Sequence, residues 1–161
     1  MNVKTLLVFI VIIGVIIVTT LFFRDDTKKP DSAGDSSGLI VSQNAIYAAE
    51  QAPGENITVS VVHFETPGFV VIHEDTSGVP GGVLGASGLL PSGETKNTPP
   101  IALSRTTKDS ETLYAMLHLD DGDGVFDAAK DNPARDSVSA EPVMMIIEIS
   151  QDAAEPGAVN L

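Results

Sequence analysis

The alternation of apolar and polar residues between positions 57 and 149 constrains the fold more than any other feature of this chain. Ile57 and Val59 are separated by a polar residue, and the run from Leu113 to Leu119 repeats the same alternation. Gly, Pro, Asn and Asp cluster between such runs at intervals of about 8 to 12 positions, a spacing typical of turns in β-sandwiches and barrels. A period of two is typical of strands that bury one face, and no run here has the period of a long helix. The pattern therefore predicts an all-β domain.

The predicted strands are short and are joined by turns rather than by crossover helices. We expect them at residues 39–48, 57–61, 69–74, 101–103, 113–119 and 143–149, with only loops or short edge strands across residues 76–93. Thr58 and Ser60 are expected on a solvent-facing side of their strand, whereas the run 69–74 is apolar on both faces and is expected to be central. About seven short strands in roughly 110 residues favour an antiparallel immunoglobulin-like or cupredoxin-like sandwich, and a small barrel is the alternative.

The N-terminus carries a second strong pattern, a run of 18 uncharged residues from Leu6 to Phe23. As a helix with a rise of about 1.5 Å per residue, this run would be about 27 Å long, close to the thickness of the hydrocarbon core of a bilayer. A cleavable signal peptide usually has a shorter apolar region followed by a small-x-small site, and Arg24 with two aspartates follows here instead. We therefore expect residues 1–23 to be a retained transmembrane anchor.

The orientation of this anchor does not follow from charge counting, because basic residues flank the apolar run on both sides. The very short N-terminal tail favours translocation of the C-terminal part. The predicted protein is therefore a single-pass protein of the cell membrane whose C-terminal domain is extracytoplasmic.

Two polar segments flank the predicted domain. Residues 24–38 contain no large apolar side chain and are rich in Ser, Gly, Asp and Lys, so we expect a disordered linker there. Residues 151–161 have a similar character and are expected to form a disordered tail. The β-sandwich domain is therefore predicted at residues 39–150, which is long enough to bury one hydrophobic core.

The chain is strongly acidic, with 9 Lys and Arg against 22 Asp and Glu and a formal net charge of -13. This charge disfavours nucleic acid and anionic lipid headgroups as partners of the folded domain. It suits a solvated exterior, divalent cations or a salty environment. The absence of cysteine excludes disulfides, thiolate metal sites and a cysteine-ligated blue-copper centre.

Three ordered motifs resemble those of an uncharacterised family. They are Gly-Phe-Val-Val-Ile-His at 68–73, Gly-Val-Leu-Gly-Ala-Ser-Gly-Leu-Leu-Pro-Ser-Gly at 82–93, and Ala-Met-Leu-His-Leu-Asp-Asp-Gly-Asp-Gly-Val-Phe-Asp at 115–127. Together they are similar to a β-rich domain of unknown function in haloarchaeal and other prokaryotic surface and secreted proteins. The resemblance implies an exported β-rich surface module and implies no reaction. His73 and His118 fall on the family motifs, and His63 does not.

The turn after residue 119 is the first candidate site. It holds four aspartates, with two glycines that let backbone carbonyls approach a cation: Asp120, Asp121, Asp123 and Asp127. Calcium binds oxygen donors of this kind in groups of six to eight. The spacing does not match an EF-hand, because Lys130 would occupy the last ligand position. Two interpretations remain open. One is a non-EF site with Ca²⁺ as the cofactor, and the other is a solvated acidic turn whose carboxylates cap the backbone.

The histidines suggest a transition metal instead. Met116 and His118 share one face of a predicted strand, and a thioether with an imidazole would suit copper. His73 is expected toward the other end of the neighbouring antiparallel strand, on the order of 10 Å or more from His118. His63 is expected at the same edge of the sandwich as His118, so this pair is the easier one to bring together. The alternative is that all three histidines are hydrogen-bonded strand residues without a metal.

These patterns together predict a membrane-anchored extracytoplasmic structural or interaction module, stabilised by calcium if the turn binds it. No enzymatic activity is expected, because no catalytic groups are spaced on rigid elements around a pocket. The expected partners are the membrane, through residues 6–23, and an unidentified surface protein or polymer. The alternative function is a periplasmic or extracellular metal-binding protein that handles copper.

Overall fold

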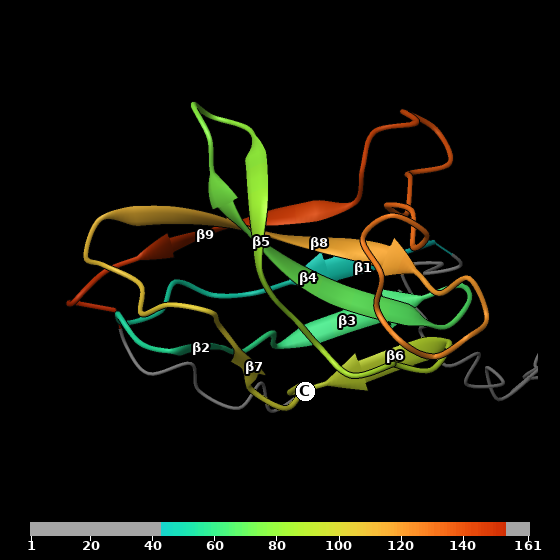
Figure 1. Cartoon of the computed structure of the whole chain (residues 1–161), viewed down its shortest axis with the longest axis horizontal. Helices are drawn as coiled ribbons and strands as arrows, with labels where there is room; N and C mark the ends of the chain where they lie inside the picture. Colours follow the sequence, from blue (N-terminus) through green and yellow to red (C-terminus); the bar gives the residue numbers. More distant parts are fainter. Residues whose placement is uncertain (1–42, 154–161) are drawn as a thin grey trace, which may run out of the picture. The chain divides into compact units, whose positions relative to one another are not determined.

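The computed structural model describes residues 43–153, and every regular element in this part of the chain is a β-strand (Figure 1). The strands are β1 (Ala45–Tyr47), β2 (Asn56–Ile57), β3 (Val61–Phe64), β4 (Gly68–Asp75), β5 (Pro80–Ala86), β6 (Gly93–Lys96), β7 (Ile101–Ala102), β8 (Glu111–Leu119) and β9 (Met144–Ile149). Residues 43–153 contain no α-helix, which confirms the predicted all-β class.

Two findings bear on the predicted anchor and its flanking segments. Nowhere between residues 43 and 153 is there a helix with the length and apolar character needed to cross a membrane. The predicted anchor at residues 1–23 and the predicted linker at residues 24–38 lie outside the described residues, as do residues 39–42 and 154–161.

The larger sheet has four antiparallel strands in the order β5-β4-β8-β9. β4 and β8 form its centre and pair continuously from Gly68 opposite Leu119 to Glu74 opposite Leu113. β4 is buried along most of its length, which confirms the prediction of a central strand. β5 lies at one edge of this sheet, as predicted for residues 76–93, but with seven residues it is longer than the short edge strand expected there.

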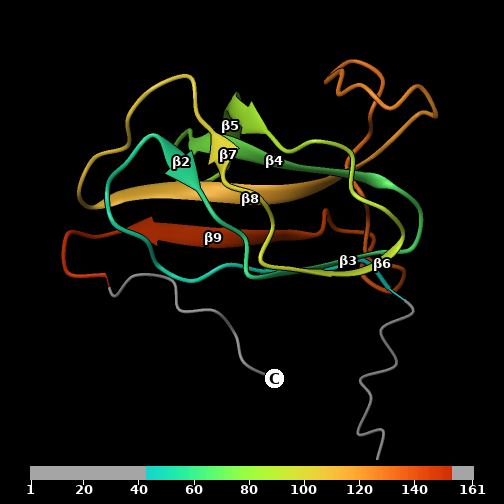
Figure 2. The same ribbon diagram turned by 90° about the horizontal axis from the view of Figure 1, so that it is seen from below.

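The remaining strands form two smaller antiparallel sheets, β1-β3-β6 and β2-β7. Both views place β2 beside β7 and β3 beside β6 (Figures 1 and 2). The core lies between these strands and the four-stranded sheet, and burying each of its large side chains stabilises the fold by about 1.5 to 3 kcal/mol. Its fully buried large members are Ile57, Phe64, Ile72, Ile101, Leu113, Leu117, Ile147 and Ile149.

The single strand predicted at residues 57–61 is wrong, because the chain changes sheets within it: β2 pairs in one sheet and β3 in another. Between them, the buried side chain of Gln51 takes the place of a neighbouring strand. Its Oε1 accepts the amide hydrogen of Thr58 at 2.9 Å, and its Nε2 donates to the Thr58 carbonyl oxygen at 2.9 Å. Buried backbone groups need partners, and here a side chain supplies them. The expected solvent exposure is also wrong for Ser60, which is buried.

The strands predicted at residues 113–119 and 143–149 are confirmed as β8 and β9. Leu113 and Leu117 of β8 and Ile147 of β9 point into the core, as the alternation predicts. The residues between them on β8 point to the other face of the sheet. The end of β8 therefore carries one histidine on that outer face and leads directly into the acidic turn.

Candidate functional site

The acidic turn, residues 120–131, follows directly from the end of β8. Gly122 and Gly124 have φ angles of 107° and 74°, a left-handed conformation that favours glycine. The chain can therefore reverse sharply, and the carboxylates of the turn accept hydrogen bonds from its own amides. The acceptors are Asp120 (from Gly124), Asp121 (from Asp123), Asp123 (from Val125), Asp127 (from Ala129) and Asp131 (from Asp121 and Asp127). These bonds are those expected of a turn whose carboxylates cap the backbone.

Asp131 lies at the centre of this arrangement, with 1% of its surface exposed. Its Oδ1 accepts from the amide of Asp121 at 3.0 Å, and its Oδ2 accepts from the amide of Asp127 at 2.7 Å. One buried carboxylate thus joins the two halves of the turn. Asp131 was not among the predicted site residues, because nothing in a polar run distinguishes a buried aspartate from its exposed neighbours.

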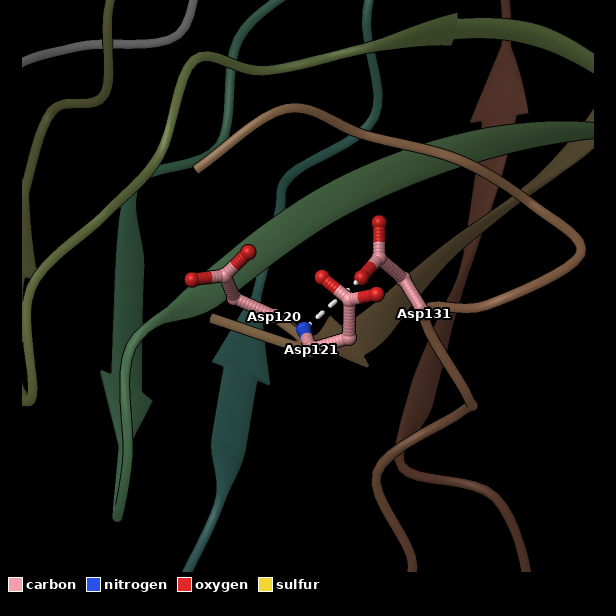
Figure 3. Close-up of side chains that lie close together, drawn as sticks. All are labelled: Asp120, Asp121 and Asp131. Atoms are coloured by element: carbon pink, nitrogen blue, oxygen red, sulfur yellow. Dashed lines mark hydrogen bonds between the residues drawn. The ribbon is translucent and has the colours of Figure 1, made fainter. Parts of the chain in front are cut away.

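Three carboxylates of the acidic turn approach one another closely (Figure 3). Asp120, Asp121 and Asp131 each place one oxygen within 4.8 Å of the others. The structure therefore brings together two of the four predicted calcium ligands and adds Asp131 to them. Calcium takes six to eight oxygens, so backbone carbonyls and water would have to complete the set. Calcium binding stays a prediction.

The other two predicted calcium ligands, Asp123 and Asp127, lie against Lys130. Its Nζ is 3.6 Å from Oδ2 of Asp123 and 3.4 Å from Oδ2 of Asp127. The pKa of Asp127 is lowered, first by the hydrogen bond from the amide of Ala129 and then by Lys130. All three charged side chains are largely exposed, so these ion pairs contribute little to stability. Their effect is to neutralise part of the charge of the turn.

The second candidate site lies on the outer face of the four-stranded sheet, where six buried side chains of β4 and β8 meet. The cross-strand pairs on this face are Phe69 with His118, Val71 with Met116, and His73 with Tyr114. The sheet is therefore buried on both faces at its centre. This is the physical reason why the run 69–72 is apolar on both faces of the strand.

His73 and His118 lie close together, so the expected separation on the order of 10 Å is wrong. Their ring centroids are 5.6 Å apart, and the ring planes are inclined by 21°. β4 pairs with β5 through register shifts on both sides of His73. The extra residues of these shifts belong to β5, because β4 stays in continuous register with β8 through His73. The two rings meet because both side chains leave the same face of adjacent strands and extend toward each other, which an estimate from backbone positions alone does not include. We call His73 and His118 the histidine pair.

Each ring of the histidine pair is held through Nδ1. Nδ1 of His73 lies 2.9 Å from the carbonyl oxygen of Gly81, and Nδ1 of His118 lies 2.7 Å from that of Asp131. A carbonyl oxygen only accepts, so Nδ1 is the donor and the neutral form of each ring carries its lone pair on Nε2. Both Nε2 atoms are buried, and within residues 43–153 they are the only buried side-chain nitrogen or oxygen atoms without a hydrogen-bond partner. Each such group costs about 1 to 3 kcal/mol, which a ligand could recover.

Phe126 of the acidic turn packs against His118 of the histidine pair. Its ring centroid is 5.6 Å from those of both His118 and Phe69, with edge-to-face geometry in each case. Burial lowers the pKa of His118; the hydrogen bond to the Asp131 carbonyl opposes this shift, and the nearby His73 adds to it. His118 is thereby kept in the neutral form that a metal ligand requires.

The other two predicted transition-metal ligands differ in their positions. Met116 is buried on the same face as the histidine pair, in the register row between those of His73 and His118. His63 lies on β3 and points away from the core, since its neighbours Val62 and Phe64 belong to the core. The expectation that His63 reaches His118 most easily is therefore wrong, because the two side chains leave different sheets on faces turned away from the shared core.

Comparison with known proteins identifies a family without a described activity. A family model described as Domain of unknown function (DUF7282) matches residues 44–150, which includes every strand of the domain. No curated protein and no solved structure matches the chain. A function can therefore be inferred only from the residues of this chain, chiefly those of the acidic turn and the histidine pair.

Proposed function

Since the chain belongs to the family of the domain of unknown function DUF7282, we propose a role from its own residues. In this proposal the protein is an extracytoplasmic structural or interaction module, held in the cell membrane by residues 6–23. Its contact surface is the acidic turn, and its partner is a surface protein or polymer that offers positive charge and an apolar contact.

The observation that carries this proposal is the way the acidic turn is built. Its carboxylates hold its own backbone, so a polar segment without regular secondary structure becomes a defined surface feature. Val125, on this turn, is 68% exposed, and Leu89, which lies beside Gly124, is 44% exposed. Exposed apolar side chains beside a carboxylate-rich turn are typical of a contact surface with a polar rim.

The finer classification of the fold and its setting belong to the same proposal. Two antiparallel layers around one core support an immunoglobulin-like or cupredoxin-like sandwich. The net charge of -13 supports the salty, haloarchaeal type of surroundings that the sequence motifs suggest.

Protease treatment of intact cells tests the proposed location. In cells that express the full-length chain, external protease is expected to remove the domain while a cytoplasmic marker survives, and the remaining fragment is expected to stay with the membrane. A domain that is protected in intact cells and cleaved only after lysis would contradict the orientation. A native protein whose first residue lies after position 24 would contradict the retained anchor.

Site-specific crosslinking tests the proposed contact surface. A photoreactive residue at position 125 is expected to form adducts on intact cells. The matched control is position 138, because Val138 is also an exposed valine in a loop and is 87% exposed. Equal crosslinking at both positions would show that exposure alone, and not the acidic turn, determines contact.

A second candidate function, the handling of copper outside the cytoplasm, is favoured by one specific observation. The histidine pair presents two buried Nε2 atoms that have no partner among residues 43–153. Polar atoms in this state are rare in folded proteins and call for a ligand, a water molecule or another explanation.

A further inference from the structure

The spacing of the histidine pair fits a shared metal ion, which goes beyond a role as a contact surface. A metal–nitrogen bond is about 2.0 to 2.1 Å long, so two imidazoles that share an ion have ring centroids about 6 Å apart or less. The observed separation of the His73 and His118 centroids is 5.6 Å. The rings come from different strands, β4 and β8, and lie on the same face of the sheet. The separation of the two centroids therefore lies within the range of two imidazoles that share one ion.

The hydrogen bonds of the two rings are those of metal-binding histidines. Such residues almost always donate the second ring N–H to a carbonyl or carboxylate, which fixes the tautomer and the ring orientation. His73 does so to Gly81, and His118 does so to Asp131. The nitrogen that would bind the metal is in both cases the buried atom without a partner. Packing of the two rings against each other does not by itself require that both donate through Nδ1 and bury an unpartnered Nε2.

The third donor and the surroundings indicate which ion fits. We propose that His73, His118 and Met116 bind copper(I) on the outer face of the four-stranded sheet. The thioether of Met116 is a soft ligand that selects copper(I), whereas imidazole alone would also suit zinc. All three ligands are neutral and lie beside the fully buried Phe69 and Val71, so a singly charged ion leaves less charge to bury than Zn²⁺ or copper(II).

The acidic turn connects this site to solvent. Phe126 lies edge-on against His118, and it is only half-buried itself. The same turn also supplies the Asp131 carbonyl that holds His118. An ion would therefore enter by displacement of Phe126, without any rearrangement of β4 or β8.

Copper loading of the full-length chain tests the proposal. The protein is purified in detergent with chelator and then given copper(I), kept reduced by ascorbate under anaerobic conditions, in competition with a coloured copper(I) chelator. We expect one copper ion per chain after dialysis. X-ray absorption is expected to show two imidazole nitrogens and one sulfur around the copper.

Three variants identify the ligands. Met116→Leu nearly keeps the side-chain volume and removes the sulfur, so it is expected to lose the sulfur neighbour and to weaken copper(I) binding roughly tenfold or more. His73→Gln and His118→Gln are expected to weaken binding roughly 100-fold or more. If a histidine variant does not fold, the X-ray absorption of the wild type and the copper binding of Met116→Leu still identify the ligands.

His63→Gln is the matched control. His63 also bonds a backbone carbonyl through Nδ1, that of Gln43 at 3.0 Å, but it lies on the other layer of the domain. Its replacement is expected to leave the copper content unchanged.

Three results would overturn the proposal. A folded wild-type protein that retains no copper would mean that a water molecule, donating to both Nε2 atoms, satisfies the pair. Equal copper retention in wild type, Met116→Leu and the histidine variants would place the copper on surface carboxylates. Tighter retention of Zn²⁺ than of copper(I) would refute the assignment to a soft, singly charged ion.

Discussion

The acidic turn and the histidine pair lie next to each other, yet they satisfy their polar groups in opposite ways. In the acidic turn, carboxylates at the surface accept hydrogen bonds from the amides of the same segment. In the histidine pair, each ring uses one nitrogen and leaves the other buried without a partner in the described chain. The acidic turn, which carries the larger charge, is thus the region whose carboxylates find hydrogen-bond donors within the same segment.

This difference shows why charge density alone is a poor guide to a binding site. Exposed carboxylates destabilise the fold little when no ligand is bound, because water and backbone amides supply their hydrogen bonds. A buried lone pair without a partner destabilises the fold by about 1 to 3 kcal/mol. Two such atoms therefore call for an explanation, such as a bound ligand. The uncharged region is therefore the stronger candidate for a specific ion.

The largest effect is expected from Asp131→Ala. The change leaves the amides of Asp121 and Asp127 without their acceptor in a buried place. Because hydrogen bonds to charged groups contribute about 1.5 to 3 kcal/mol each, we expect the free energy of unfolding to fall by about 3 to 5 kcal/mol in denaturant titration. The control is Asp123→Ala, an exposed aspartate that accepts from one amide, with an expected loss of about 1 kcal/mol or less. Equal losses would mean that Asp131 is not the centre of the turn.

Phe126→Ala tests whether Phe126 shields His118 from solvent. Removal of a half-buried phenyl ring is expected to lower the free energy of unfolding by about 1 to 3 kcal/mol, less than for a fully buried phenylalanine. It should also expose His118, so diethyl pyrocarbonate is expected to modify His118 faster than in the wild type. Val125→Ala, at the exposed neighbouring position, should leave the modification rate unchanged. An unchanged rate in Phe126→Ala would show that something other than Phe126 shields the histidine pair.

Thermal melting with and without calcium tests whether the acidic turn binds a cation in addition to making its internal hydrogen bonds. At ten times its dissociation constant, a ligand adds about 1.4 kcal/mol, so millimolar calcium is expected to raise the melting temperature by several degrees over chelator at matched ionic strength. Asp120→Asn with Asp121→Asn should abolish this shift, because both residues belong to the three-carboxylate cluster.

The matched control for calcium is Asp123→Asn with Asp127→Asn, which removes the same charge from the residues that pair with Lys130. It should keep the shift. In both double variants the amide oxygen of asparagine can still accept the backbone hydrogen bond, so the calcium-free melting temperature should change little. Identical melting of the wild type in calcium and in chelator would leave the turn as a capped loop without a metal.

The smallest effect is expected at acid pH. Hydrogen bonds from the amides of Ser139 and Val138 lower the pKa of Asp136. Its contribution to stability is therefore fully present above the unfolded-state pKa of about 3.9 and is lost as the pH falls through the lowered folded-state value. Asp136→Asn should reduce the loss of stability below pH ~4, measured by thermal melting. The exposed Asp152→Asn is the control, and equal acid sensitivity of the two variants would contradict the assignment.

The sequence predicted the parts of the candidate site that local chemistry determines and missed those that depend on packing. Gly122 and Gly124 in an aspartate-rich run predict a capped turn, because only glycine adopts the required φ freely and short carboxylates reach nearby amides. Met116 and His118 were placed on one face because strands have a period of two. The approach of His73 to His118 was not predictable, because it depends on the directions that the two side chains take from their strands, which a residue pattern does not give.

The all-β class, the central position of β4 and the core face of β8 could be predicted from the sequence alone, because burial on one or both faces of a strand leaves a periodic or continuous apolar pattern. Three features follow only from the folded chain: the change of sheets beside Gln51, the burial of Asp131, and the contact of Phe126 with His118. Each of these depends on partners far away in sequence or on a bend in the backbone. A pattern of neighbouring residues does not encode such contacts, because the same polar residue can lie in a solvated loop or be buried beneath another segment of the chain.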